Sequence, residues 1–182
     1  MRPASDPALS YLELKDNRLH SILELTNAIN ANMAIEQLYR IFTFILKEQL
    51  HFSRFALLHQ QDEWTLAAKS GYKRKIEAEE LALELARFKE ITLVESSNSA
   101  LLQDFQAVIP IYHQDRPLAY LILATPSKTE SLEPAHFSFA QTLTNILTVA
   151  LENRKLSAQN EIKEQISKEL ELASEMQKLL FP

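Results

Sequence analysis

Apolar residues return every three or four positions along the last part of the chain, from Phe137 to Leu180, where neither glycine nor proline interrupts the pattern. This spacing predicts one long helix with an apolar stripe. A helix of this length has more apolar surface than one small domain can cover, so its second half, from about Arg154, needs another partner. The stripe of that second half consists of Ile162, Ile166, Leu170, Ala173, Met176 and Leu180.

The partner that this stripe favours is the same helix of a second chain, in a parallel coiled coil. Two sets of residues could face the partner helix, and we call each set a seam. Each seam contains one polar residue, Glu169 or Gln177, so the pattern does not choose between them. The first seam uses Ile162, Ile166, Glu169, Ala173, Met176 and Leu180. The second seam uses Ile166, Leu170, Ala173, Gln177 and Leu180.

A similar stripe lies near the start of the chain and predicts an N-terminal helix over residues 9–33. Residues 1–8 contain two prolines and are expected to be disordered. Because the two stripes resemble each other, we expect the N-terminal helix to pack near the terminal helices of the dimer. Its stripe consists of Leu12, Leu19, Ile22 and Ile29.

The middle of the chain, residues 34–151, mixes helical and strand patterns and predicts one α+β domain. Its antiparallel sheet should have helices on both faces, because the last strand is apolar on both sides. Pro110 cannot donate to a strand ladder, so a bulge or a solvent-facing amide is expected there. Residues 101–105 fit a strand or one helical turn equally well. The predicted elements are helices over 35–49 and 76–88, a hairpin of 52–59 with 64–70, a short strand over 91–95, and a hairpin of 107–112 with 118–124.

The amino-acid composition argues against several kinds of function. A net charge of −5 with mixed signs gives no sign of a nucleic-acid partner. The chain has no cysteine, which excludes disulfides and thiolate chemistry and fits a reducing cytoplasm. No apolar run has the length of a signal peptide or a membrane span, so we expect a cytoplasmic protein that does not enter a membrane. A single glycine, Gly71, excludes the common glycine-rich phosphate loops.

Candidate catalytic and metal-binding residues are also missing from the pattern. The five histidines, at 20, 51, 59, 113 and 136, show no helical ligand spacing, so no metal site is expected. Glu79, Glu80 and Glu84 have the spacing of a solvated helix face, and no G-x-S-x-G motif occurs. We therefore expect no enzymatic activity and no cofactor within these residues.

The middle of the chain resembles a GAF domain, a small α/β sensor module, over about Ala34–Leu151. The resemblance depends on Phe55–Leu58, on Trp64–Gly71, and on Ala107–Ile111 followed by Leu118–Leu123, where a proline such as Pro110 is typical. It implies that a small ligand can lie between the sheet and its covering helix. Tyr72, Phe88, Phe105 and Tyr120 could line such a space, or could be ordinary core residues.

The family's known ligands find little support. The N-K-x-F-D-E-type motif of relatives that bind cyclic nucleotides is absent, and attachment of a bilin to cysteine is excluded. Haem bound through a histidine has no supporting motif.

The end of the chain, Glu169–Pro182, is similar to the segment that enters the catalytic domain of SpoIIE/RsbU-type serine phosphatases. The resemblance implies that residues 152–182 are a coiled-coil linker to a metal-dependent serine/threonine phosphatase domain beyond Pro182, where Mn or Mg would bind. Histidine-kinase connectors need a histidine near the helix end, and the last one here is His136. The predicted function is therefore a homodimeric sensor that controls its own phosphatase domain, and whether it binds an unknown small-molecule ligand is left open by the sequence. The alternative is a ligand-free dimerisation scaffold that spaces the catalytic domains.

Overall fold

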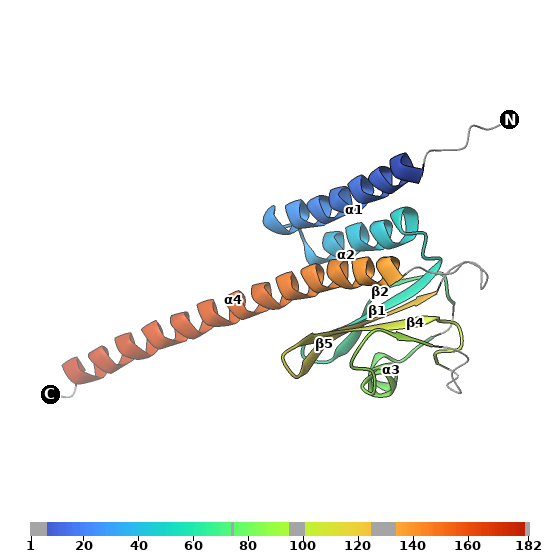
Figure 1. Cartoon of the computed structure of the whole chain (residues 1–182). Helices are drawn as coiled ribbons and strands as arrows, with labels where there is room; N and C mark the ends of the chain where they lie inside the picture. The colour runs from blue at the N-terminus through green and yellow to red at the C-terminus, as the bar shows by residue number, and fades with distance from the viewer. Residues whose placement is uncertain (1–6, 74, 95–100, 125–133, 181–182) are drawn as a thin grey trace. The chain divides into compact units, whose positions relative to one another are not determined.

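The computed structural model describes residues 7–73, 75–94, 101–124 and 134–180. Within these residues the strands form a five-stranded antiparallel sheet with the order β2-β1-β5-β4-β3 (Figure 1). This arrangement, with helices on both faces, confirms the predicted α+β fold class. The strands are β1 (Arg54–Gln60), β2 (Trp64–Ser70), β3 (Thr92–Leu93), β4 (Ala107–His113) and β5 (Arg116–Ala124).

The helices surround this sheet in the order that the sequence predicts. They are α1 (Pro7–Asn30), α2 (Ile35–Phe44), the π-helical turn η1 (Ile45–Gln49), α3 (Ala78–Leu85) and α4 (Pro134–Leu180). Helix α1 begins at Pro7, where proline is well tolerated, so residues 7 and 8 of the predicted disordered start are helical. Residues 1–6 of that prediction lie outside the described residues. Helix α1 ends before Asn32, whose φ of 52° is the left-handed conformation that commonly terminates a helix.

The predicted single helix over 35–49 is wrong in its second part, which widens into η1. The amide of Leu50 bonds to the carbonyl oxygen of Ile45 at 3.0 Å, five residues back along the chain. Ile45 and Leu46 are both fully buried, and the wider turn lets these two consecutive side chains face the core. Spacing of apolar residues alone cannot reveal such a turn.

The hairpins are confirmed, and the strand ends that differ from the prediction do so by one or two residues. Residues 101–104 form turns, and the amide of Phe105 bonds to the carbonyl oxygen of Leu102, so the helical-turn alternative holds there. Strand β4 pairs with β3 only at Ala107 and Val108, which leaves Pro110 beyond that pairing. Pro110 itself pairs regularly with Tyr120, and the register of β4 with β5 shifts between Ile111 and Tyr112, so the irregularity lies after Ile111 and not at the proline.

Each face of the sheet has its own helical cover. Figure 1 shows α1, α2 and the first part of α4 on one side of the sheet, and α3 on the other. The core on the α3 side contains Leu81 and Leu85 of the helix against alternate residues of the strands. On the opposite side, fully buried residues include Leu25 of α1, Phe42 of α2, and Leu143 and Leu147 of α4.

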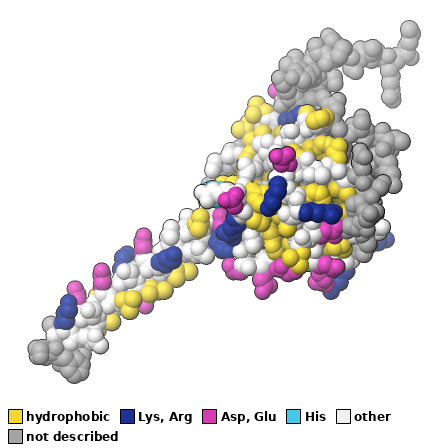
Figure 2. Space-filling model, turned by 60° about the horizontal axis from the view of Figure 1, so that its bottom comes forward, with side chains coloured by type: hydrophobic (Ala, Val, Ile, Leu, Met, Phe, Trp, Pro, Cys, Tyr) yellow, Lys and Arg dark blue, Asp and Glu magenta, His cyan; other side chains and the backbone are white. Residues whose placement is uncertain are grey.

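The chain divides into two compact units between Thr148 and Val149. The first unit contains the sheet, and the second consists of the remainder of α4. Figure 2 shows hydrophobic side chains gathered along one side of that second part of the helix. None of the described helices combines the length and the hydropathy that crossing a bilayer would require.

Candidate functional site

The four residues proposed from the sequence to line a ligand space come together on the α3 side of the sheet. Tyr120 and Phe105 belong to the buried core there, while Tyr72 and Phe88 are partly buried and pack against it. The rings of Tyr72 and Phe105 meet edge to face, with centroids 5.6 Å apart. We call Trp64, Tyr72, Phe88, Phe105, Tyr112 and Tyr120 the aromatic cluster.

Tyr120, at the centre of the aromatic cluster, is fully buried. Its ring lies 5.2 Å from that of Trp64 between centroids, and its hydroxyl is 3.1 Å from the hydroxyl of Tyr112. Lys89 donates to the Tyr112 hydroxyl at 3.0 Å, with its ammonium 4.7 Å from the ring centroid. Burial, followed by the bond with Tyr112, raises the pKa of Tyr120 above its usual range. Tyr120 is therefore neutral at physiological pH and can act only as a hydrogen-bonding wall.

Tyr72 differs from Tyr112 and Tyr120 in the hydrogen bonding of its hydroxyl group. Its hydroxyl oxygen is buried and has no hydrogen-bond partner among the described residues. Burial raises the pKa of Tyr72. Most buried hydroxyls are hydrogen-bonded, so this group is the one atom of the cluster that a bound ligand would satisfy.

The aromatic cluster contains few polar groups. In the described part of the chain, no three histidine or acidic side chains lie together as metal ligands. The aromatic cluster presents ring faces and tyrosine hydroxyls, and Lys89 lies beside it on Tyr112. None of these groups is placed as a nucleophile beside a base.

The second candidate surface is the apolar stripe of α4. Ile162, Ile166, Leu170 and Met176 are 56%, 52%, 66% and 64% exposed, and Ala173 is exposed as well. The side chain of Leu180 lies outside the described residues. So many large apolar side chains on one helix leave a surface that another apolar surface can cover.

The stripe of α1 is only partly available. Leu19 is 56% exposed, whereas Ile22 and Ile29 are half-buried, and the side chain of Leu12 lies outside the described residues. The side of α1 that is buried consists of Ser21, Leu25 and Ala28 instead. The helix therefore uses one side for the domain core and keeps Leu19 and Leu23 outside it.

Sequence reasoning missed four residues that bear on these surfaces. Val149 and Leu156 are exposed apolar residues, and their heptad spacing continues the second seam towards the N-terminus. Tyr112 lies four residues after Val108 on β4, so a regular strand has both side chains on the same face of the sheet. This spacing could have placed Tyr112 in the aromatic cluster. Glu79, interpreted as part of a solvated face, accepts a hydrogen bond from the backbone amide of Trp64 at 2.9 Å.

Comparison with known proteins supports the fold. No family model matches the chain, and no curated protein matches it. Among solved structures, the GAF domain of a predicted sensor histidine kinase from Pseudomonas syringae pv. tomato is 13% identical, with a TM-score of 0.62 over 86% of this chain and 99% of that one.

Two further GAF domains are similar to a comparable degree. That of a phosphoenolpyruvate-protein phosphotransferase from Coxiella burnetii is 20% identical, with a TM-score of 0.58 over 78% of this chain and 96% of that one. A phycoerythrobilin-bound GAF domain from a cyanobacterial phytochrome is 14% identical, with a TM-score of 0.58 over 79% and 99%. At these identities the likeness shows that the chain has a GAF-type fold.

Proposed function

We propose that this chain is a regulatory domain that dimerises and controls a metal-dependent serine/threonine phosphatase domain following Pro182. The observation that carries the proposal is the exposed apolar stripe of α4, on a helix that begins within the α/β unit and continues to Leu180. A continuous helix that leaves a domain with unpaired apolar residues is suited to pairing with its own copy. The similarity of residues 169–182 to phosphatase linkers supports the identity of the controlled domain.

In this proposal the two seams are the two states of the regulator. A two-helix connector can change its rotation or register when two packings have similar energy. Both seams share Ile166, and each contains one polar residue, so neither has a clear advantage. The α/β unit would choose between them and thereby position two phosphatase domains.

The test is a fusion of this chain to a SpoIIE/RsbU-type phosphatase domain, with turnover of a phosphoserine substrate measured in manganese. Glu169→Leu should favour the first seam and Gln177→Leu the second, so the two variants should change basal turnover in opposite directions. Glu171→Leu, which lies on neither seam, is the matched control. Equal turnover in all fusions, with dimerisation intact, would mean that the helix transmits no signal.

The second candidate function is the ligand-free scaffold, and the packing of the aromatic cluster favours it. The ring contacts of Tyr120 with Trp64 and Tyr112 are those of a filled core. A sensor should be stabilised by its ligand, because binding to the folded state raises the free energy of unfolding. A thermal-shift screen separates the two: a stabilising planar compound that loses its effect in Tyr72→Phe supports a sensor.

A further inference from the structure

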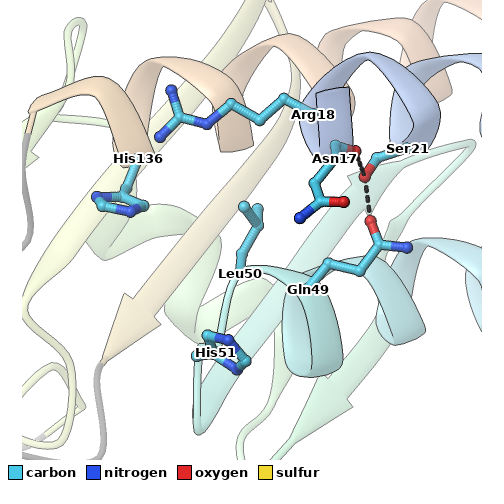
Figure 3. A pocket seen from close by; sticks show the side chains of 7 residues that line it. All are labelled: Asn17, Arg18, Ser21, Gln49, Leu50, His51 and His136. Carbon is cyan, nitrogen blue, oxygen red and sulfur yellow. Dashed lines mark hydrogen bonds between the residues drawn. The ribbon is translucent and has the colours of Figure 1, made fainter. Parts of the chain in front are cut away.

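A cavity of about 150 Å³ lies between α1, the end of η1 with the two residues that follow it, and the first turn of α4 (Figure 3). It belongs to the α1 side of the sheet, away from the aromatic cluster. No acidic side chain is among the described residues that line it, while one guanidinium and two imidazoles are. The lining consists of Asn17, Arg18, Ser21, Gln49, Leu50, His51 and His136.

Arg18 has no carboxylate partner in the described part of the chain. Its guanidinium carbon lies 5.6 Å from the centroid of the Phe139 ring, and Figure 3 shows the side chain extending towards His136. A guanidinium presents a planar fork of donors that matches an oxyanion. The positive end of the α4 dipole lies at the same cavity, because His136 is in the first turn of that helix.

The backbone of the facing wall has two unusual features in succession. The π-helical turn η1 ends at Gln49, and His51 has a φ of 56° although it is not glycine. Both π-turns and left-handed non-glycine residues are enriched at functional sites. With this backbone, the three consecutive residues Gln49, Leu50 and His51 all line the cavity.

The polar side chains that line the cavity have hydrogen-bond donors available for a ligand. The Ser21 hydroxyl lies between the backbone oxygen of Asn17, at 2.8 Å, and the side-chain oxygen of Gln49. The Gln49 amide oxygen is thus occupied, which leaves its amide nitrogen as a donor. Nδ1 of His136 is buried and has no hydrogen-bond partner among the described residues. Rotation of the imidazole ring would let this nitrogen bond to an oxygen atom bound in the cavity.

We infer that this cavity binds a small oxyanion, a phosphate or a short carboxylate, with Arg18 as its principal ionic contact. A volume of about 150 Å³ exceeds the roughly 10–15 Å³ that one water needs and is below the roughly 300 Å³ of pockets for drug-sized ligands. Because the lining comes from both α1 and α4, a bound anion would tie these two helices together within the α/β unit. This site goes beyond the proposed control of a phosphatase and does not depend on it.

The test is calorimetric titration of the 182-residue chain with sodium phosphate and with sodium acetate, against sodium chloride at equal ionic strength. We expect saturable binding of at least one oxyanion, weakened at least tenfold in Arg18→Gln. Arg40→Gln, which removes the same charge from an exposed position on α2, should bind like the unaltered chain. Phosphate binding without acetate binding identifies a phosphate site, and the reverse a carboxylate site. Heats that match chloride for both anions, or equal affinity in Arg18→Gln, would overturn the inference.

A second measurement needs no variant and therefore does not depend on the folding of Arg18→Gln. In ¹⁵N-labelled chain, the side-chain amide signals of Asn17 and Gln49 should shift saturably with the oxyanion that binds. Shifts confined to exposed lysines such as Lys73 would show an adventitious ion only and overturn the site. Failure of this inference would leave the dimerisation of the chain unchanged, so the two proposals are separable.

Discussion

Replacing Ile166 by serine is the sharpest test of association through α4, because Ile166 belongs to both seams. The side chain is 52% exposed in the single chain, so about half of its surface is still available to a partner. Complete burial of an isoleucine contributes about 1.5–3 kcal/mol, so the remaining half is worth roughly 0.8–1.5 kcal/mol per helix. A dimer contains two copies, and the loss is therefore about 1.5–3 kcal/mol, which weakens the dimer by about 10- to 150-fold.

Sedimentation equilibrium over a range of micromolar concentrations measures this change directly. Glu164→Ser provides the control, since Glu164 is exposed, lies two residues before Ile166 and belongs to neither seam. Circular dichroism should show that Ile166→Ser keeps the helix propensity of the unaltered chain, because serine and isoleucine have similar helix propensities. If Ile166→Ser dimerised as tightly as the unaltered chain, the α4 stripe would not be the interface. A monomeric unaltered chain would refute the dimer itself.

Three further predictions concern the fold, a buried tyrosine and catalysis. Gly71→Ala should lower the free energy of unfolding by about 2–5 kcal/mol, since a positive φ costs an alanine roughly 1–2 kcal/mol and overpacking about 1–3 kcal/mol. The φ of Gly71 is 77°, and the Cβ of an alanine there would meet the carbonyl oxygen of Ser53. Urea unfolding measures the effect, with Ser70→Ala as the control. A loss of free energy of unfolding below about 0.5 kcal/mol would contradict the prediction. Burial raises the pKa of Tyr39 to about 12, so the unfolded chain loses this proton first and stability should fall as the pH rises from about 10 to 12. Tyr39→Phe should make that fall shallower in chemical unfolding, and an unchanged slope would argue against it. The isolated chain should not hydrolyse a phosphoserine peptide in manganese or magnesium, and metal-dependent turnover by pure chain would show a catalytic site within residues 1–182.

The sequence was most informative where one period extends over many residues. Helix α4 and the hairpins were predictable because a period of 3.6 or 2 is repeated often enough to exclude the other. The short strand over 91–95 was predicted, but its length was not, because β3 (Thr92–Leu93) extends only where β4 offers a partner, at Ala107 and Val108. The π-turn at Ile45–Gln49 leaves the composition of a helix unchanged and so has no signal of its own.

Helix α1 shows why an apolar stripe does not by itself reveal the buried side. The stripe with Leu19 and Ile22 was predicted to pack near the terminal helices of the dimer, whereas the side that the domain core buries contains Ser21 and Ala28 beside Leu25. Small residues allow a neighbouring element to approach closely, and a count of large apolar residues overlooks them. The cavity at Arg18 was equally hidden, since its lining combines three elements that are distant in the chain.

The buried threonines of α4 have a mechanical consequence. Thr144 and Thr148 are the buried polar side chains of this helix among the described residues. Each donates its hydroxyl to a carbonyl oxygen one turn earlier, Thr144 to Ala140 at 2.7 Å and Thr148 to Thr144 at 2.8 Å. Both hydrogen bonds therefore lie within α4 and move with it. An axial displacement of α4 would break neither bond, so resistance to it comes from the packing of buried apolar neighbours such as Leu143 and Leu147.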